Sequence, residues 1–264
     1  MNEIVTGIIG DGTAASCHAH EINISSSFSL LALAPGNQKK GRQLGLSHHI
    51  AYIDKDPEYL LERDEIDAVV IALPTEKHGE YIKYVTSYSK IALSESPLSL
   101  SPKECTDILR LVQNGEYVFY ANPYLYLPFL ENISSSFHTF SLEFSSISMK
   151  TEETLQIALE VLIRLFGHTV SISPSDNGCA YYARFERGEG MFECSFASDL
   201  NGLTLIVDGE RVIDGLLYYD ALPHFYSFVY SALEMGREIE SVLETALEAA
   251  LLREKILPSG NILI

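Results

Sequence analysis

An apolar segment that runs directly into a glycine-rich turn is the feature that most constrains the fold of this chain. Residues 4–9 read IVTGII, and residues 10–15 read GDGTAA. The first glycine of such a turn permits a sharp change from strand to helix, and the second removes a Cβ that would hold the backbone away from a pyrophosphate. A helix that begins here also presents free N–H groups to phosphates. The turn therefore predicts dinucleotide contacts from Gly10, Asp11, Gly12, Thr13, Ala14 and Ala15.

The amino-terminal half of the chain alternates apolar strands with helices. Uninterrupted apolar strands separated by helices are typical of a parallel sheet that is covered on both faces. The strands are expected at Ile4–Ile9, Phe28–Ala34, Ile50–Ile53, Ala68–Leu73, Lys90–Ser94 and Tyr117–Ala121. We therefore predict an α/β fold in which residues 1–122 form a doubly wound parallel sheet of the Rossmann type.

Residues 123–264 have a different pattern. Short segments of alternating polarity follow one another between glycine-marked turns, two of which are expected at Arg187–Gly190 and Asp208–Gly209. This spacing is typical of antiparallel strands. Helices are expected at Glu152–Phe166, Pro223–Met235 and Val242–Lys255. The pattern predicts a second, α+β domain with a mostly antiparallel open sheet, which begins near residues 122–128.

Charge and cysteine content exclude several classes of partner. The chain has 18 Lys and Arg against 36 Asp and Glu, for a formal net charge of -18. Nucleic acid and anionic membranes are therefore poor partners, because both require clustered basic residues. No apolar run is long enough to span a bilayer and no signal-peptide pattern opens the sequence, so a cytoplasmic protein is expected. The cysteines are widely separated, and no group of side chains has metal-ligand spacing, so neither a disulfide framework nor a metal site is predicted.

Four segments together resemble the glucose–fructose oxidoreductase / inositol dehydrogenase family, often written Gfo/Idh/MocA. The first is TGIIGDGTAA around the glycine-rich turn, and the second is DAVVIALPTEKH at residues 67–78. The third is SESPL at residues 94–98, which stands where the family has E-K-P-L. The fourth runs from FERGEG at residues 185–190 to VDG at residues 207–209. The resemblance implies a Rossmann domain followed by an α+β domain that binds substrate.

The resemblance also implies where a cofactor would lie. Pro74, Thr75 and His78 would line the cofactor side of the exit from the fourth strand, and Glu95 would follow the fifth strand. Ligands of open α/β sheets do lie at the carboxyl ends of the strands. For His78, the residues alone leave a second interpretation, in which a histidine at a helix start hydrogen-bonds to a neighbouring loop.

The chain departs from the family at the positions that handle protons. The Lys of E-K-P is Ser96 here, and the Asp and His of a later family helix fall on Glu153 and Ile157. Oxidation of an alcohol requires a base that titrates near the working pH, which neither Ser96 nor Ile157 supplies. The candidate catalytic residues are Glu95, Ser96, Glu153 and Tyr124. With 15 tyrosines in the chain, packing is the competing role for Tyr124, and His18 is expected to be a surface or packing residue.

The second determinant of the cofactor also departs from the family. An acidic residue about 20 positions after the glycines normally binds the adenosine ribose. Here the second strand ends in ALAPGN at residues 32–37, without an acid, and Lys39, Lys40 and Arg42 follow. We expect these residues to meet a 2′-phosphate, so that NADP(H) is favoured over NAD(H). A solvated helix start is the competing interpretation.

Two functions remain open at this point. The departures favour a divergent NAD(P)-dependent oxidoreductase that transfers hydride to a small carbonyl, imine or conjugated acceptor. Biliverdin reductases, which are related in architecture, likewise lack the Lys of this segment. The alternative is a catalytically inactive relative that binds dinucleotide, or has lost it, and acts as a sensor or assembly subunit.

A homodimer or higher homo-oligomer is also expected. The family commonly pairs through the open sheet of its second domain, and the sequence has enough apolar residues for two faces of this sheet. These residues are Phe140, Leu142, Phe144, Met191, Phe192 and Phe196.

Overall fold

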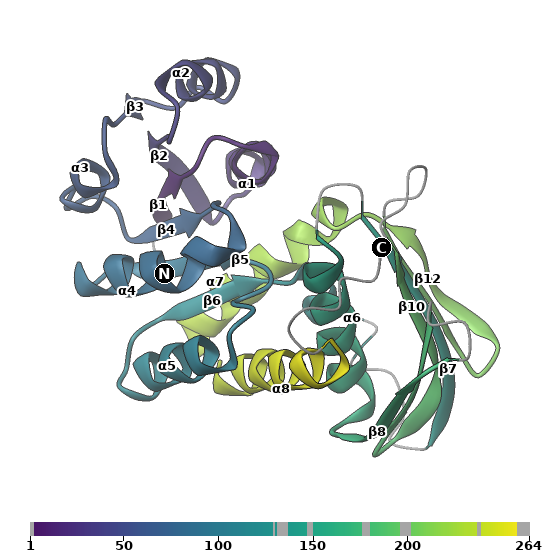
Figure 1. Ribbon diagram of the computed structural model, residues 1–264. Coiled ribbons are helices and arrows are strands. Elements are labelled where there is room, and N and C mark those ends of the chain that lie inside the picture. Colours follow the sequence, from purple (N-terminus) through teal and green to yellow (C-terminus); the bar gives the residue numbers. More distant parts are fainter. Residues whose placement is uncertain are drawn as a thin grey trace. The chain divides into compact units, whose positions relative to one another are not determined.

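The chain divides into two compact units, which are described separately. The first contains Met1–Ala121 together with Phe225–Leu243, and the second contains Asn122–His224 together with Glu244–Ile264. The sequence predicts one division after residue 122 and contains no sign that the later segment returns to the first unit. Figure 1 presents the computed structural model, which describes residues 3–128, 130, 137–146, 150–175, 180–195, 202–236 and 239–257.

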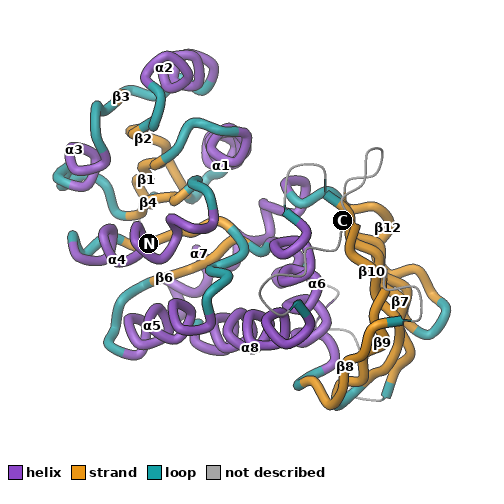
Figure 2. The backbone as a smooth tube through the Cα atoms, in the orientation of Figure 1, coloured by secondary structure: helices purple, strands orange, loops and turns teal. Residues whose placement is uncertain are grey.

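The first unit contains a six-stranded, fully parallel sheet in the order β3-β2-β1-β4-β5-β6. Its strands are β1 (Ile4–Ile9), β2 (Phe28–Ala34), β3 (Tyr52–Ile53), β4 (Ala68–Ile71), β5 (Ile91–Glu95) and β6 (Val118–Ala121). Every residue of β4 and β6 is buried, as strands covered on both faces require. Figure 2 shows helices on both sides of this sheet. The predicted doubly wound parallel sheet is confirmed.

Helices connect these strands and begin at residues that favour helix starts. The connecting helices are α1 (Thr13–Ile24), α2 (Gln38–Ser47), α3 (Pro57–Leu61), α4 (His78–Ser87) and α5 (Pro102–Gln113). Asn37 caps α2, because its side chain accepts hydrogen bonds from the N–H groups of Lys39 and Lys40. The strand order reverses between β1 and β4, and ligands of doubly wound sheets bind at the carboxyl ends of strands at such a reversal.

A segment near the end of the chain also packs on the first unit. The last two helices are α7 (Leu222–Met235) and α8 (Glu240–Ile256). Within the segment Phe225–Leu243, the ring of Tyr226 packs edge-on against Phe28, with ring centroids 5.0 Å apart. The Tyr120 hydroxyl donates a hydrogen bond to the carbonyl oxygen of Val242 at 3.1 Å. The helices themselves follow from local patterns, whereas these long-range contacts do not.

The second unit contains a six-stranded sheet in the order β12-β11-β7-β10-β9-β8. Its strands are β7 (His138–Ser145), β8 (Thr169–Pro174), β9 (Ala180–Phe185), β10 (Gly188–Ser195), β11 (Gly202–Val207) and β12 (Glu210–Leu216). The strands β7 and β10 run parallel, and the other four neighbouring pairs are antiparallel. The predicted α+β domain with a mostly antiparallel sheet is confirmed.

The two faces of this sheet differ in polarity. In β7 the residues at positions 140, 142 and 144 are buried, beginning with Phe140. The residues between them are exposed or half-buried. Phe192 of β10 pairs with Leu142 and shares this face, which helix α6 (Thr151–Phe166) covers. Of the apolar residues expected to supply a second face, Met191 lies on the opposite side. Phe140, Leu142, Phe144 and Phe192 share the covered face, so an apolar interface on the opposite face stays a prediction.

The turns of this sheet are only partly those predicted. Asp208 and Gly209 form the turn between β11 and β12 and both have positive φ, 51° and 83°, as a tight hairpin turn requires. The turn predicted at Arg187–Gly190 lies slightly earlier, at Glu186 and Arg187, and Gly190 already belongs to β10. A Cβ on Gly190 would lie 1.9 Å from the carbonyl oxygen of Phe140, so this glycine permits close contact between strands. Phe196 lies outside the described residues.

Two further features concern the whole described chain. None of the helices in the described ranges is both long and apolar enough to cross a bilayer. Among the described residues, Cys17, Cys105 and Cys194 form no disulfide, and burial raises the pKa of the Cys194 thiol. Cys179 lies outside the described residues.

Candidate functional site

The glycine-rich turn has the geometry that its sequence predicts. Gly10 has a φ of +138°, and a Cβ built on it would lie 2.2 Å from the carbonyl oxygen of Ala72. The close approach of the ends of β1 and β4 therefore requires this glycine. Gly12 caps α1 with a φ of -90°, and a Cβ on it would meet no described atom within 4 Å. Gly12 thus borders open space at the N-terminus of a 12-residue helix, where backbone N–H groups favour an anion.

The carboxylate of Asp11 lies at the end of β2. Its Oδ2 accepts a hydrogen bond from the backbone N–H of Asn37 at 2.6 Å. Residues 32–37 contain no acid, as the sequence shows, and the glycine-rich turn brings a carboxylate to this position instead. The side chains of Lys39 and Lys40 are exposed nearby on the first turn of α2. Charges of both signs thus lie where the adenosine half of a dinucleotide would bind.

His78 connects the loop after β4 to the loop after β5. Its Nδ1 lies 2.9 Å from the carbonyl oxygen of Pro97, and its Nε2 lies 2.8 Å from the carbonyl oxygen of Leu73. Both ring nitrogens therefore face backbone acceptors, which is the geometry of the loop-anchoring interpretation. At the same exit Pro74 is exposed and Thr75 is buried. Contact of these residues with a cofactor stays a prediction.

The exit from β5 carries two buried polar residues. Glu95 ends the strand with 5% of its surface exposed, and Ser96 follows with 7% exposed. The Ser96 hydroxyl is buried and has no hydrogen-bond partner among the described residues. A buried polar group without a partner costs about 1–3 kcal/mol. A ligand that hydrogen-bonds to Ser96 would remove this cost.

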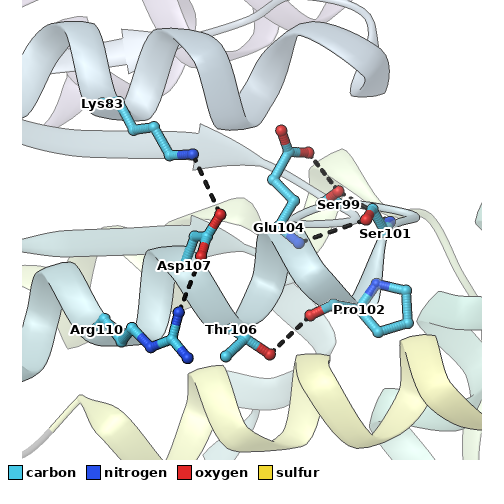
Figure 3. A network of polar contacts seen from close by, with 8 residues as sticks. All are labelled: Lys83, Ser99, Ser101, Pro102, Glu104, Thr106, Asp107 and Arg110. Atoms are coloured by element: carbon cyan, nitrogen blue, oxygen red, sulfur yellow. Dashed lines mark hydrogen bonds and ion pairs between the residues drawn. The ribbon is translucent and has the colours of Figure 1, made fainter.

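A network of polar contacts holds the segment between β5 and α5 (Figure 3). The Ser101 hydroxyl oxygen accepts a hydrogen bond from the N–H of Glu104 at 3.4 Å. The carboxylate of Glu104 accepts a hydrogen bond from the Ser99 hydroxyl at 2.5 Å, and the Ser99 oxygen accepts one from the N–H of Ser101 at 3.0 Å. An ion pair of 3.6 Å between Lys83 and Asp107 joins α4 to α5. These contacts fix the backbone that follows Glu95 and Ser96.

A buried hydrogen-bonded triad joins three elements of the first unit. His18 Nε2 lies 2.7 Å from Glu95 Oε1, and His18 Nδ1 lies 2.6 Å from the hydroxyl oxygen of Tyr226. The exposed fractions of His18, Glu95 and Tyr226 are 0%, 5% and 4%. Burial, and to a smaller extent the charges of Glu95 and Glu21, raise the pKa of Tyr226 well above its usual value. The expectation that His18 is a surface or packing residue missed this triad.

The sequence does contain a signal for His18. The residue belongs to a buried stripe of α1 that has the helical spacing i, i+3, i+4 and i+7. The stripe consists of Ala15, His18, Ala19 and Ile22. A histidine in an apolar stripe requires a buried partner. Its partners could not be read from the sequence, because they lie 77 and 208 residues further along the chain.

Together these features fit a nicotinamide dinucleotide. The open space beside Gly12 and the N-terminus of α1 suit the pyrophosphate. The Ser96 hydroxyl lies at the carboxyl end of β5, in the other half of the sheet. This buried hydroxyl has no hydrogen-bond partner among the described residues. Both positions belong to the edge at which doubly wound sheets bind dinucleotides.

Tyr124 belongs to the second unit, where its side chain is buried. The residue is 0% exposed, and its hydroxyl donates a hydrogen bond to the carbonyl oxygen of Leu216 at 2.8 Å. Its ring packs edge-on against Phe144 and Tyr218. Burial, and then the charge of Asp220, raise the pKa of Tyr124 above its usual value. These contacts favour the packing interpretation, and a catalytic role for Tyr124 stays a prediction.

Glu153 also belongs to the second unit, in the first turn of α6. Its carboxylate accepts a hydrogen bond from the N–H of Lys150 at 2.9 Å, which caps the helix. Ile157, one turn later, is fully buried. A catalytic role for Glu153 stays a prediction.

A buried polar pair on α6 and the segment after β6 was not predicted. Glu160 is 0% exposed, and its Oε2 accepts a hydrogen bond from Asn122 Nδ2 at 2.7 Å. The Asn122 side-chain oxygen is buried and has no partner among the described residues. The sequence signal for this pair is a glutamate that stands among the apolar residues of α6. A glutamate at such a position is seldom buried without a partner.

The amino-terminal part of the chain matches a family model. Residues 4–122 match the model of an oxidoreductase family with an NAD-binding Rossmann fold, GFO_IDH_MocA. The uncharacterized oxidoreductase YrbE of Bacillus subtilis (strain 168) is 32% identical over 111 residues, which are 42% of this chain and 33% of that protein. The chain thus spans about a third of the length of the curated relatives it matches.

Solved structures resemble the chain over almost its whole length. A myo-inositol dehydrogenase from Corynebacterium glutamicum has a TM-score of 0.78 at 14% identity, covering 97% of this chain and 96% of that one. Biliverdin reductase from Synechocystis, solved with biliverdin and NADP+, has a TM-score of 0.67 at 15% identity, covering 96% and 98%. At these identities the likeness shows the fold of both halves of the chain.

Proposed function

Because the chain belongs to the Gfo/Idh/MocA family of NAD-binding oxidoreductases, we propose that it is an NAD(P)-dependent reductase of a small carbonyl, imine or conjugated acceptor. The observation that carries this proposal is the combination of open space at Gly12 with a buried Ser96 hydroxyl that has no partner among the described residues. Both lie at the carboxyl edge of one parallel sheet. Bound NAD(P)H supplies the hydride.

The residues of this edge bind and polarise rather than act as a base. Gly12 and the first N–H groups of α1 hold the pyrophosphate, since nothing described fills the space beside them. The Ser96 hydroxyl donates a hydrogen bond to the oxygen or nitrogen of the acceptor and so stabilises charge that develops there. Because a hydroxyl is a poor base, water or the acceptor's own acidic group supplies the proton. Reduction of a polarised acceptor is therefore favoured over oxidation of an alcohol.

We propose NADP(H) as the preferred cofactor, with Lys39 and Lys40 meeting the 2′-phosphate. Both side chains are exposed on the first turn of α2, directly after the end of β2. Asp11 would instead favour NAD(H), because its carboxylate would repel a 2′-phosphate and accept a hydrogen bond from a ribose hydroxyl. The Asn37 N–H binds one oxygen of that carboxylate, which reduces its availability. Separate titrations with NADPH and NADH test the preference, and tighter binding of NADH would contradict it.

A catalytically inactive relative is the second candidate, and Ser96 and Ile157 favour it. These residues stand where the family's Lys and His handle protons, and the fully buried Ile157 has no titratable group. Such a protein would bind NAD(P)H and act as a sensor or assembly subunit.

We further propose a homodimer through the outward face of the second-unit sheet. Tyr182 and Met191 are register partners on this face, with 56% and 42% of their surfaces exposed. The substitution Met191→Glu would place a charge inside such an interface and dissociate it. Sedimentation at micromolar concentration tests this, and a monomeric wild type would contradict it.

Single-turnover hydride transfer tests the main proposal. The protein is mixed with stoichiometric NADPH and a panel of carbonyl, imine and enone compounds, and NADPH absorbance is followed. Ser96→Ala should slow transfer by about 10- to 100-fold. Ser87→Ala is the control, since that hydroxyl only donates to the Tyr84 carbonyl on α4. Binding without transfer across the panel would favour the inactive relative, and absence of binding would contradict the proposed reductase.

A further inference from the structure

The protons of the His18–Glu95–Tyr226 triad can be assigned from its hydrogen bonds. Among the described residues, His18 is the sole hydrogen-bond partner of the Tyr226 hydroxyl. The hydroxyl is buried and its pKa is raised well above the usual value, mainly by burial, so it keeps its proton. A buried O–H group requires an acceptor, and here the acceptor is His18 Nδ1.

This assignment determines the charge of the other two groups. With Nδ1 accepting from Tyr226, the ring of His18 is neutral and carries its proton on Nε2. The Nε2–H group then donates to Glu95 Oε1 at 2.7 Å. Glu95 Oε1 therefore acts as an acceptor, which is the role of an ionised carboxylate. The triad therefore carries one negative charge, on Glu95.

The charge lies on the nicotinamide side of the sheet. Glu95 is the last residue of β5, which belongs to the half of the sheet that follows the order reversal at β1 and β4. A dinucleotide extends across this reversal, from one mononucleotide half to the other. The next residue in the chain is Ser96, whose buried hydroxyl has no hydrogen-bond partner among the described residues.

We propose that this triad is an electrostatic device that favours the oxidised form of the bound cofactor, with Tyr226 as the positioning residue that keeps the charge on Glu95. The inference rests on the proposed nicotinamide site. The nicotinamide ring is a cation when oxidised and neutral when reduced, so a fixed negative charge binds the oxidised form more strongly. A unit charge changes such an equilibrium by about tenfold over roughly 12 Å at an effective dielectric constant of about 20. For a two-electron couple, tenfold corresponds to a potential lower by about 30 mV.

The roles of the three residues follow from this arrangement. Glu95 supplies the charge, and His18 orients the carboxylate through its Nε2–H group. Tyr226 occupies the second nitrogen of His18 with a donor. If that donor is absent, Nδ1 is free to take a proton, and the resulting imidazolium cancels the charge of Glu95. Helix α7, from a late part of the chain, thereby influences a site built by β5.

Dissociation constants for oxidised and reduced cofactor test the proposal without any turnover. Isothermal titration with NADP+ and NADPH is performed on the wild type and on Glu95→Gln, Tyr226→Phe and Tyr120→Phe. Glu95→Gln should weaken NADP+ binding about tenfold more than NADPH binding. Tyr226→Phe should change the ratio of the two constants in the same direction by a smaller factor. Tyr120→Phe is the matched control, because its buried hydroxyl donates to the Val242 carbonyl and not to the triad.

The outcomes separate this inference from the proposed function. A purely structural triad would weaken both nucleotides equally in Glu95→Gln and Tyr226→Phe, and an unchanged ratio in both variants would overturn the inference. A wild type that binds neither nucleotide would instead contradict the proposed function. If Glu95→Gln does not fold, Tyr226→Phe alone decides, since it removes one oxygen atom and no charge.

Discussion

The carboxylate of Asp11 lies 2.6 Å from the backbone nitrogen of Asn37, so a residue of the glycine-rich turn places an acid beside the end of β2. This contact bears on the choice between NAD(H) and NADP(H). Asp11→Asn keeps an oxygen acceptor for Asn37 but removes the charge. We expect the affinity for NADPH to rise by about threefold to tenfold and that for NADH to fall, as measured by fluorescence titration. Equal changes in the affinities for NADPH and NADH would show that Asp11 does not distinguish the ribose hydroxyl from the 2′-phosphate.

The two glycines of the turn should respond differently to alanine. Gly10→Ala introduces a Cβ 2.2 Å from the Ala72 carbonyl oxygen at a positive φ. We expect it to lower the free energy of unfolding by about 2–4 kcal/mol. Gly12 has a negative φ and open space, so Gly12→Ala should leave this free energy within about 1 kcal/mol of wild type. Urea denaturation measures both, and similar losses for the two variants would contradict this distinction.

The ion pair of His168 and Glu248 should make stability depend on pH. His168 Nδ1 lies 2.6 Å from Glu248 Oε2, and this hydrogen bond raises the pKa of His168 above 6.5. A raised pKa in the folded state stabilises the fold below the unfolded pKa, and the contribution is lost as the pH rises through the folded pKa. Glu248→Gln should therefore be less stable than wild type at about pH 5.5 and equal to it near pH 9.

The control for this pair is Glu254→Gln, which removes an exposed charge from the same helix. Denaturation curves at both pH values should show no comparable loss for the control. A loss for Glu248→Gln that is the same at both pH values would mean that the pair does not titrate as described.

A second carboxylate in place of Asn122, beside the buried Glu160, should lower the free energy of unfolding. Asn122→Asp replaces the donor 2.7 Å from Glu160 Oε2 with a like charge in a buried position. We expect a loss of about 2–4 kcal/mol at pH 7, and a smaller loss at about pH 5 where carboxyl groups begin to protonate. Asn114→Asp, at the exposed end of α5, is the control in chemical denaturation. An equal loss in the two variants would contradict the contact.

Much of the first unit could be predicted because its signals are local. The strand expected at Phe28–Ala34 has those bounds in the structure, since an apolar run between helix-breaking residues is sufficient to define it. The roles of Gly10 and Gly12 follow from neighbouring residues in the same way. Hydrophobic periodicity likewise predicts helix α6, with an error of one residue at its start.

The rest could not be predicted because it depends on contacts between distant residues. Nothing near His18 in the sequence indicates that Tyr226 will reach it, and nothing near β2 indicates that Asp11 will supply its acid. In the second sheet, the register of β7 and β10 decides that Phe192 shares a face with Leu142, which composition alone does not specify. The contacts of side chains at the site depend on distant residues in the same way.

Binding of NADPH to the wild type and to Gly12→Ala, followed by nucleotide fluorescence, decides whether the turn at residues 10–15 holds a nicotinamide dinucleotide. We expect saturable binding to the wild type and binding weaker by about tenfold or more in Gly12→Ala, because the added methyl group occupies the space left for the pyrophosphate. Wild type that leaves the fluorescence unchanged, or Gly12→Ala that binds equally tightly, would contradict it.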